Sequence, residues 1–342
     1  MINEINVIYQ FNERYVPYAG VSLTSLLVNN TDAAAINIYI LAEGISEASK
    51  EKLRKTAEGF GRNIVFPDTA PLLASFAKMG MLPYRGAYSV YLRLFFDRLP
   101  ELSGIQDGRV LYLDSDTIVE GSLLPLMNHD LGGKTLGMVL ESITDDYKVM
   151  IGMDRTDDYF NSGVILYDVG RWKEKAYSER LTGHIKNVRS SYIGDQDFIN
   201  IVCEGDICRL PIIYNFQPLH GRYSASQYFE AYTSEGYYGP SEIEEGKSSA
   251  VIYHCYRWLG EFPWHKGNLH PFGDRFDTYL KMSEWKDLVK TKADKGPALA
   301  IEKMLYKLLP RCVFIRIFRK AHELMLKGAE KDARIKRASI NS

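Results

Sequence analysis

The stretch RVLYLDSDTIVE, residues 109–120, decides the fold class that the sequence predicts. Residues 110–113 form a continuous apolar run, which is typical of a strand buried on both faces of a parallel sheet. The run ends at two carboxylates, Asp114 and Asp116, with only Ser115 between them. Because residues two apart in an extended chain point to the same side, we expect both carboxylates to face one spot. Ligands bind just beyond the carboxyl ends of strands in open α/β sheets, so the sequence predicts a site there.

This pair of carboxylates is a candidate metal site. Two like charges held close together repel each other, and a hard divalent cation relieves that repulsion. Mg²⁺ and Mn²⁺ prefer carboxylate oxygens and are often shared with substrate phosphates. A solvated acidic turn is the simpler interpretation of an Asp-x-Asp triplet, but the buried strand that precedes this triplet favours a metal site.

Length and composition narrow the class of protein. At 342 residues the chain can hold one large domain with an extension, or two small domains. Its 46% hydrophobic and 25% charged residues are those of an ordinary globular protein. The net charge of -1 and the lack of a basic-aromatic pattern argue against a nucleic-acid partner.

Cysteine spacing and hydropathy indicate the cellular compartment in which the protein is expected. The four cysteines have neither zinc-like nor disulfide-like spacing, which favours a reducing compartment. The first residues lack the basic segment and apolar core of a signal peptide. No run of about 18 apolar residues occurs, so we expect no membrane span and a cytoplasmic location.

The first half of the chain alternates between short apolar strands and segments with helical spacing. Ser46 is the expected N-cap of the second helix, and Arg93 lies on the third. Such alternation predicts an α/β fold with a mostly parallel sheet. The strands are expected at 5–9, 36–41, 64–66, 110–113 and 136–140, and the helices at 16–29, 46–60 and 88–99.

The second half is less regular. A strand is expected at 159–167, a helix at 171–188, and another helix that begins near the acidic residues of 194–197. The tyrosine-rich stretch 214–238 has the composition of a loop. A final strand at 251–254 ends in His254, a potential metal ligand.

Six segments of the chain, taken in order, resemble glycosyltransferase family 8, particularly the bacterial lipopolysaccharide and lipooligosaccharide galactosyl- and glucosyltransferases. The resemblance covers about residues 5–270. An isolated Asp-x-Asp triplet is weak evidence, whereas six segments in the family's order are specific. The segments are LAEGISEA (41–48), RVLYLDSDTIV (109–119), IGM (151–153) with YFNSGVIL (159–166), GDQDFIN (194–200), YNFQP (214–218), and the stretch from His254 to Pro263, Trp264 and His265.

The resemblance implies a GT-A fold, the α/β fold of nucleotide-diphospho-sugar transferases, with a Rossmann-like sheet in a catalytic domain over residues 1–270. It implies a retaining enzyme that moves a hexose from UDP-galactose or UDP-glucose to a glycan or lipid-linked acceptor. The product would be a cell-surface polysaccharide, lipopolysaccharide or glycoprotein. Mn²⁺, or Mg²⁺ in its place, is the implied cofactor, and Asp114, Asp116 and His254 match the family's metal ligands. Such a cation would hold the diphosphate and stabilise the leaving charge.

The resemblance also implies a donor site. Gln196 matches the residue beside the anomeric carbon, and with Asp195 it forms the implied catalytic pair. We expect Gln196 to stabilise an oxocarbenium-like transition state rather than attack, because an amide is a poor nucleophile. The side chains implied to contact uracil and ribose are Gln10, Asn12 and Tyr15, and those implied to hold the rest of the UDP-sugar are Arg93, Asp114, Ser115, Glu141, Asn161, Ser162, Asp195 and Gln196.

One stretch departs from the family's pattern. The family usually has a glycine three residues after its histidine and a lysine directly before Pro-Trp, and both touch the diphosphate. This chain has Arg257 and Phe262 in those places, with two extra residues between them. Arg257 or Lys266 is the expected replacement for the lysine, because either supplies a cation and arginine suits bidentate phosphate contact.

Other interpretations of these residues stay open at the level of sequence. Arg93 alone is compatible with an ordinary buried arginine, and Asn161 with a turn former beside Gly163. A haloacid-dehalogenase-like phosphatase would use Asp114 as its nucleophile, but its motif normally lies on the first strand of the fold. A non-catalytic nucleotide-sugar-binding protein is the third alternative.

The tail differs from the rest in charge. Residues 290–297 have the composition of a linker. From 296 to 342 there are eleven Lys and Arg residues against four Asp and Glu residues. We expect a C-terminal helical extension over 271–342, in which Pro310 divides two basic amphipathic stretches.

The second of these stretches has two faces. One interpretation is a helix that contacts an anionic membrane through residues 298–337 at the inner face of the cell membrane. The other is a helix that packs on the catalytic domain and leaves its basic face in water. The apolar face comprises Val313, Phe314, Ile317, Phe318, Ala321, Leu324 and Met325, and the basic face comprises Arg316, Arg319, Lys320, Glu323 and Lys327.

Overall fold

The computed structural model describes residues 1–321 and Leu324, except 82, 84–86, 103–104, 106–107, 188–193, 233–235 and 295. Strands and helices alternate through its first half, as the sequence predicts. The strands are β1 (Glu4–Asn12), β2 (Ala35–Glu43), β3 (Ile64–Val65), β4 (Arg109–Asp114), β5 (Thr117–Val119), β6 (Leu136–Leu140), β7 (Phe160–Asp168), β8 (Ile207–Arg209) and β9 (Ile252–His254). The α-helices are α1 (Val16–Val28), α2 (Glu47–Glu58), α3 (Ala70–Lys78), α4 (Leu124–Met127), α5 (Asp145–Ile151), α6 (Val169–Glu174), α7 (Tyr177–Asn187), α8 (Asp195–Val202), α9 (Pro218–Arg222), α10 (Ala225–Ala231), α11 (Pro240–Ser249), α12 (Gly273–Met282) and α13 (Pro297–Leu308).

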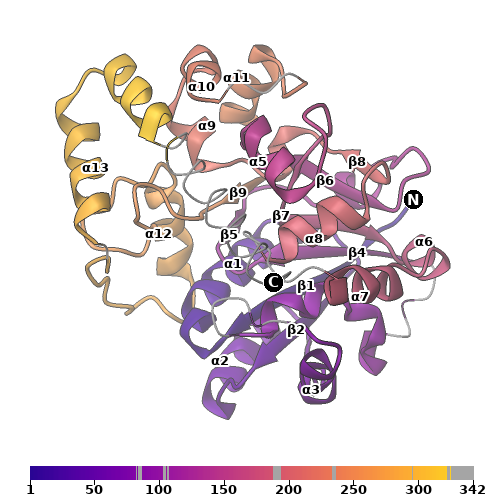
Figure 1. The fold of residues 1–342 in the computed structure, drawn as a ribbon. Helices are drawn as coiled ribbons and strands as arrows, with labels where there is room; N and C mark the ends of the chain where they lie inside the picture. The colour runs from indigo at the N-terminus through magenta and orange to yellow at the C-terminus, as the bar shows by residue number, and fades with distance from the viewer. Residues whose placement is uncertain are drawn as a thin grey trace.

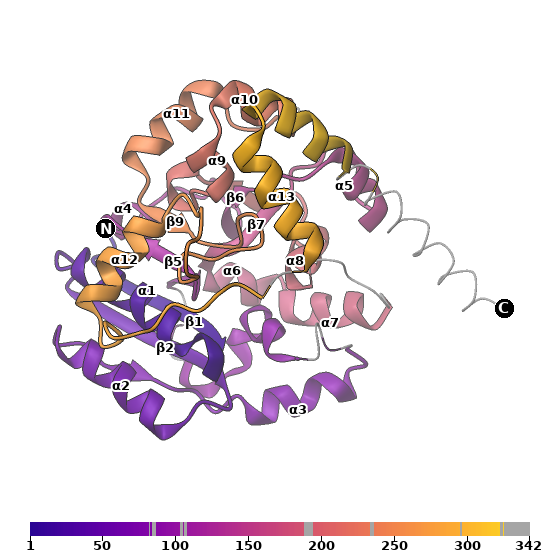
Figure 2. The ribbon, with the colours of Figure 1, turned by 90° about the vertical axis from the view of Figure 1, so that its left-hand side faces the viewer.

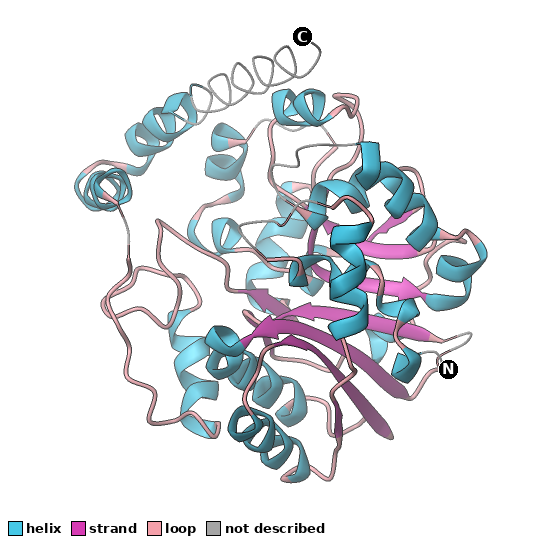
Figure 3. Ribbon diagram, turned by 60° about the horizontal axis from the view of Figure 1, so that its bottom comes forward, coloured by secondary structure: helices cyan, strands magenta, loops and turns pink. Residues whose placement is uncertain are grey.

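A seven-stranded sheet with the order β3-β2-β1-β4-β7-β6-β8 forms the centre of the molecule (Figure 1). Neighbouring strands are parallel except around β7, which runs antiparallel to both β4 and β6. Helices cover both faces of the sheet (Figure 3), so the apolar run of β4 is fully buried. The predicted α/β class and mostly parallel sheet are confirmed.

A small second sheet pairs β5 with β9. In this antiparallel pair Thr117 lies opposite His254. The backbone N–H of Cys255 donates to the carbonyl of Asp116 at 2.7 Å, which continues the pairing towards β4. The second sheet therefore brings the end of β9 beside the end of β4, although the two are 140 residues apart in the sequence.

Three local predictions are wrong. The segment 88–99 forms short 3₁₀ turns at Ser89–Leu94 and Phe96–Arg98 rather than one helix. Its apolar side chains are buried except for the partly buried Tyr88 and Val90, and the N–H of Arg93 donates to Oε1 of Gln10 instead of to a helical carbonyl. The expected helix at 171–188 is divided into α6 and α7 by Ala176, which has a left-handed φ of 50°; position 188 lies outside the described residues.

The third wrong prediction is the loop at 214–238, which contains α9 and α10. Ser224 and Gln227 form a capping box at the start of α10, a signal that was available in the sequence. The tyrosines of this stretch form part of the core, as in the stacked pair Tyr228 and Tyr237 at 4.9 Å. Strand β1 is also longer than predicted, because residues 10–12 continue to pair with β2.

The C-terminal part begins with α12, which packs on α1. The hydroxyl of Tyr279 accepts from Nδ2 of Asn29 at 2.8 Å, and the ring of Trp285 lies so close to Gly20 that a Cβ there would clash. Beyond α13, a helix at 311–321 lies beside α10 (Figure 2). No helix among the described residues has both the length and the hydropathy needed to cross a bilayer.

Some side chains of this extension pack on the rest of the protein, and others are exposed to solvent. Phe314 and Ile315 are buried, and Arg316 pairs with Glu230 at 3.1 Å. The interpretation of a helix that packs on the catalytic domain is thus correct for this side. Met325 and Lys327 lie outside the described residues, as does most of the expected membrane segment beyond 321. From α13 onward, the large apolar side chains that are exposed among the described residues are Ile301, Met304, Leu308, Val313, Ile317 and Leu324.

Candidate active site

Asp114, Asp116 and His254 meet at the carboxyl edge of β4. Nε2 of His254 lies 3.5 Å from Oδ2 of Asp114 and 3.4 Å from Oδ1 of Asp116. One potential ligand atom from each residue lies within 4.8 Å of the other two. The histidine is buried and both carboxylates are partly exposed, so the cluster is open on one side. Two carboxylate oxygens, one imidazole nitrogen and room for substrate oxygens fit Mn²⁺ or Mg²⁺.

The way in which the chain brings the two carboxylates together differs from the prediction. Residues 115–116 form a turn between β4 and β5 rather than an extended segment. The hydroxyl of Thr117 donates to the backbone carbonyl of Asp114 at 2.8 Å and closes this turn. The same hydroxyl lies 3.0 Å from that of Ser22 on α1, which anchors the turn to the core.

The charges of the cluster act on its histidine. Burial alone would lower the pKa of His254, because it disfavours the imidazolium. The carboxylates of Asp116 and Asp114 outweigh that effect and raise the pKa above its usual value. A metal ligand must be a neutral imidazole, so we expect affinity for a divalent cation to fall at acidic pH.

Arg93 connects this cluster to Asp195. Its Nη1 lies 3.0 Å from Oδ1 of Asp114, and its Nε lies 3.1 Å from Oδ2 of Asp195. The hydroxyl of Tyr112 also donates to Oδ1 of Asp114, at 2.6 Å. Asp114 therefore uses Oδ1 for protein contacts and turns Oδ2 towards His254. The structure thus places Arg93 between the carboxylates of Asp114 and Asp195.

Asp195 begins α8, directly after Gly194, whose φ is 64°. Burial raises the pKa of the Asp195 carboxyl to about 6, against the opposing effect of Arg93. A buried carboxyl with a raised pKa beside a cluster of potential metal ligands is typical of functional sites.

Gln196 faces Ser162 of β7. Its Oε1 accepts from the N–H of Ser162 at 2.9 Å, and its Nε2 lies 3.3 Å from the hydroxyl of Tyr159. That hydroxyl donates to the buried Asp197 at 2.6 Å. These contacts fix the orientation of the amide, because a backbone N–H is only a donor.

A series of hydrogen bonds leads from Glu141 to His254 of the carboxylate–histidine cluster. Asn161 donates from Nδ2 to Oε2 of Glu141, and its Oδ1 accepts from Nδ2 of Asn215 at 2.8 Å. Oδ1 of Asn215 lies 3.1 Å from Nδ1 of His254. Burial raises the pKa of Glu141. The sequence analysis singled out Glu141, Asn161 and His254 but missed Asn215, although the YNFQP segment contains it.

The residues expected to contact uracil and ribose lie on the neighbouring strand. Gln10 pairs with Asp114 in the β1–β4 register. Asn12 ends β1, and its side chain caps the 3₁₀ turn at Glu13–Tyr15. The ring of Tyr15 lies edge-on to Trp264 at 6.5 Å, and burial and the charge of Asp116 raise the pKa of Tyr15. Ser115 is buried in the turn of the cluster.

The two candidate replacements for the missing lysine lie in different surroundings. Arg257 is exposed, three residues after His254, and its guanidinium lies 5.3 Å from the ring of Phe262. Phe262 itself stacks on Trp264 at 4.4 Å and fills the place of the lysine with an aromatic ring. Lys266 is exposed, and its backbone N–H donates to the backbone carbonyl of Thr291, in the segment that leads to α13.

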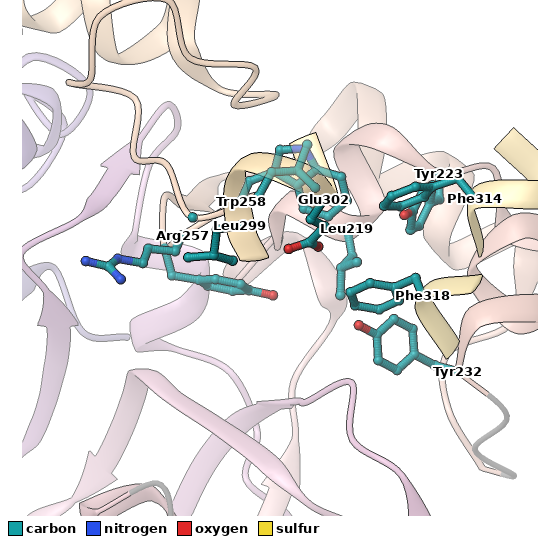
Figure 4. Close-up of a pocket in the computed structure, with 12 residues that line it drawn as sticks. Leu219, Tyr223, Tyr232, Arg257, Trp258, Leu299, Glu302, Phe314 and Phe318 are labelled. Carbon is teal, nitrogen blue, oxygen red and sulfur yellow. The ribbon is translucent and has the colours of Figure 1, made fainter. Parts of the chain in front are cut away.

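A pocket of about 230 Å³ lies beside this part of the chain (Figure 4). Tyr256, which directly precedes Arg257 in the sequence, lines this pocket. Its ring lies edge-on to that of His254, with 5.0 Å between the ring centroids. The C-terminal extension also lines the pocket, through Leu299, Glu302, Phe314 and Phe318. Trp258 also lines the pocket, and its buried Nε1 has no hydrogen-bond partner among the described residues.

Comparison with known proteins agrees with this arrangement. The sequence profile of glycosyl transferase family 8 matches residues 6–265. The lipopolysaccharide 1,2-glucosyltransferase of Escherichia coli K12 is 27% identical over 83% of this chain and 79% of its own length. General stress protein A of Bacillus subtilis is 23% identical over 81% of this chain and 93% of its own length.

Solved structures agree with the family match. The galactosyltransferase LgtC, solved with donor and acceptor sugar analogues, superimposes with a TM-score of 0.66 and 26% identity over 82% of this chain and 96% of its own. This neighbour has the GT-A fold, which confirms the predicted fold. With its matching profile, its fold and its carboxylate–histidine cluster, the chain belongs to glycosyl transferase family 8.

Proposed function

We propose that the protein is a metal-dependent, retaining glycosyltransferase that moves galactose or glucose from a UDP-sugar to a glycan acceptor. The observation that carries this proposal is the cluster of Asp114, Asp116 and His254 at the carboxyl edge of the sheet, connected through Arg93 to Asp195. Family membership favours a transferase over the phosphatase with Asp114 as nucleophile and over a non-catalytic binding protein.

The three cluster residues would hold Mn²⁺ or Mg²⁺. When bound, the cation supplies positive charge for the diphosphate and for the charge that develops on the leaving group. Gln10, Asn12 and Tyr15, which lie along the end of β1, would bind uracil and ribose. Arg257, as the exposed cation nearest to His254 in the sequence, would contact the diphosphate in place of the family's lysine; Lys266 is the second candidate.

The chain's own residues would then position the donor sugar. Arg93 holds Asp195 in place, and that carboxylate would accept hydrogen bonds from sugar hydroxyls. Gln196 is fixed by Ser162 and would lie beside the anomeric carbon, where its dipole stabilises positive charge. Ser115, Glu141 and Asn161 complete the polar surroundings of the sugar.

We propose the pocket at Tyr256 as the place of the acceptor sugar. A transferase binds its second substrate beside the first. The ring of Tyr256, which lines this pocket, contacts the ring of His254, a proposed metal ligand. Aromatic walls with hydroxyl groups suit a sugar ring, which presents apolar and polar faces. The volume of about 230 Å³ is below the roughly 300–1,000 Å³ of drug-sized sites, which favours a single ring.

The kind of product follows from the relatives only by analogy. A lipopolysaccharide glucosyltransferase and the galactosyltransferase LgtC support a bacterial-type cell-surface glycan, with a lipid-linked acceptor. The exposed apolar strip on α13 and on the helix at 311–321, together with the basic residues there, would contact an anionic membrane surface at the cytoplasmic side.

A donor panel tests the proposal. Release of the nucleoside diphosphate, UDP from the three UDP-sugars and GDP from GDP-mannose, is measured with UDP-galactose, UDP-glucose, UDP-N-acetylglucosamine and GDP-mannose, with Mn²⁺ and with chelator. We expect turnover with a UDP-hexose that requires the cation, and a product whose anomeric configuration equals that of the donor. An inverted product, or turnover that survives the chelator, would contradict the proposal.

A further inference from the structure

We propose that Asn215 is a positioning residue that holds the proton of the His254 side chain on Nδ1 and thereby leaves the Nε2 lone pair for the metal. This inference rests on the proposed metal site and names a residue that neither the sequence analysis nor the family match assigned. It follows from the direction of three hydrogen bonds, each of which determines the next.

The direction is set by a backbone group whose role is unambiguous. The N–H of Gly163 lies 2.9 Å from Oδ1 of Asn161, and a backbone N–H is only a donor. This atom of Asn161 must therefore be the carbonyl oxygen and not the amide nitrogen. Oxygen and nitrogen of an amide are otherwise assigned from the hydrogen-bond network, so a fixed donor at one end is decisive.

The next step orients Asn215. Its side chain approaches the same Oδ1 of Asn161 at 2.8 Å, so the atom that faces Asn161 must be the donor Nδ2. Its Oδ1 is then the atom that lies 3.1 Å from Nδ1 of His254. An amide oxygen only accepts, so Nδ1 must carry a proton. A neutral imidazole with its proton on Nδ1 has a free lone pair on Nε2.

That lone pair points at the cluster. Nε2 of His254 is the atom that lies 3.4 Å from Asp116 and 3.5 Å from Asp114. The other ring nitrogen of a metal-bound histidine is commonly held by a hydrogen bond that fixes the tautomer. Asn215 occupies that place here.

The far end of the chain is consistent with this direction. Nδ2 of Asn161 donates to Oε2 of Glu141, whose Oε1 accepts from the N–H of Ser142 at 2.8 Å. The direction does not depend on the charge of Glu141, because Gly163 alone fixes Asn161. The side-chain amides of Asn161 and Asn215 thus each have one defined orientation.

The backbone holds Asn215 in register with the histidine. The N–H of Phe216 donates to the carbonyl of Ile252 at 2.8 Å, and the N–H of His254 donates to the carbonyl of Phe216 at 3.0 Å. The ring of His254 itself fits against Gly163, where an added Cβ would lie 2.1 Å from Cε1. Asn215 is fully buried, so water does not compete for its amide.

The proposal is tested by the tautomer and by metal affinity. The protein is labelled with ¹⁵N-histidine, and long-range ¹H–¹⁵N correlation spectra are recorded without metal and with diamagnetic Mg²⁺, at a pH where His254 is neutral. The spectrum of His254→Gln assigns the signal. We expect the Nδ1–H pattern in the wild-type protein. A proton on Nε2 in the metal-free wild-type protein would overturn the proposal without any variant.

The variant Asn215→Leu removes both hydrogen bonds at similar volume. We expect it to lose the fixed Nδ1–H pattern and to bind Mn²⁺ about 10- to 100-fold more weakly, as for other losses of outer-shell partners. The matched control is Gln217→Leu, an equally buried amide two residues away whose Nε2 donates to the carbonyl of Leu140. This control should cost comparable stability without a change in tautomer or affinity.

Three outcomes are distinct. A folded Asn215→Leu protein with wild-type tautomer and Mn²⁺ affinity would refute the role of Asn215. Equal losses in Asn215→Leu and Gln217→Leu would show a merely structural role and also refute it. A wild-type protein that binds no Mn²⁺ would refute the proposed metal site itself, whatever the tautomer.

Discussion

The carboxylate–histidine cluster of Asp114, Asp116 and His254 is held in place by different interactions from those that hold the C-terminal extension. Around the cluster, buried charges and amides are held by partners of defined direction, as in the pairs of Arg93 with Asp114 and Asp195. The extension is attached by aromatic contacts such as Tyr306 with Phe314, and leaves many apolar side chains in water. Polar networks fail when one member is lost, whereas apolar contacts weaken gradually. We therefore expect a single substitution to disrupt the cluster, whereas a single substitution in the extension should have a small effect.

The largest effect is expected at Gly163. In Gly163→Ala the new Cβ would lie 2.1 Å from the His254 ring, which must move out of the cluster. We expect Mn²⁺ binding to fall by more than about 100-fold, beyond the range for outer-shell changes, because a ligand itself is displaced. Calorimetric titration measures this. The matched control is Gly183→Ala in α7, where a Cβ meets no atom within 4 Å; weak binding there as well would point to a general loss of folding.

The next effect is expected at Arg93. Arg93→Met leaves the buried Asp195 and the partly exposed Asp114 without their cation, and removal of one partner of a buried pair costs about 3–5 kcal/mol. Chemical denaturation measures the free energy of unfolding, and UDP release measures activity. We expect both to fall. Arg155→Met, which removes an exposed ion pair with Asp146, should change neither.

A smaller effect is expected from pH. The proposed role of Asp195 needs its carboxylate, whose pKa is raised to about 6 by burial, so activity should rise with pH through about 6 and then level off. The stability contribution has the opposite sign: the folded state favours the protonated form, so this contribution is present below the ordinary pKa and is lost as pH rises towards 6. A pH profile of kcat measures the first. An unchanged acidic limb in a still active Asp195→Asn would contradict the assignment.

The smallest effects are expected in the extension. Phe318→Ala removes part of the proposed acceptor wall, and we expect transfer to the acceptor to fall about tenfold, which corresponds to ~1.4 kcal/mol, without a change in UDP affinity. Equal losses of acceptor transfer and of UDP affinity would show that Phe318 contributes to the stability of the fold and not to the acceptor site.

Met304→Ser tests the membrane contact by co-sedimentation with anionic vesicles. We expect a reduction of pelleting, and none for Val149→Ser, whose side chain is equally exposed on another helix. Equal pelleting of the two variants would remove the support for a membrane-facing strip.

The sequence predicted the parts of the fold that depend on short-range pattern. The apolar run of β4, the N-cap at Ser46 and the end of β9 at His254 are in place because each follows from neighbouring residues. The wrong helix at 88–99 shows where short-range pattern fails. The apolar residues predicted one helix, but most of the segment is buried and the N–H of Arg93 bonds to Gln10, and the chain forms short 3₁₀ turns instead.

The site shows the same limit. Family order identified Asp114, Asp116 and His254, which the structure brings together. The turn at 115–116 and the β5–β9 pairing that join them depend on contacts between distant segments. Asn215 was missed because a buried amide has no signature in sequence; only its place between Asn161 and His254 reveals it.

The most direct test of the account is the binding of UDP measured by calorimetry, with and without Mn²⁺, to the wild-type protein and to Asp116→Asn. We predict micromolar-range binding, corresponding to about -8 kcal/mol, that requires Mn²⁺ and is lost in the variant. Wild-type protein that fails to bind UDP in the presence of Mn²⁺, or binding that Asp116→Asn retains in full, would contradict a metal-dependent UDP-sugar site at this cluster.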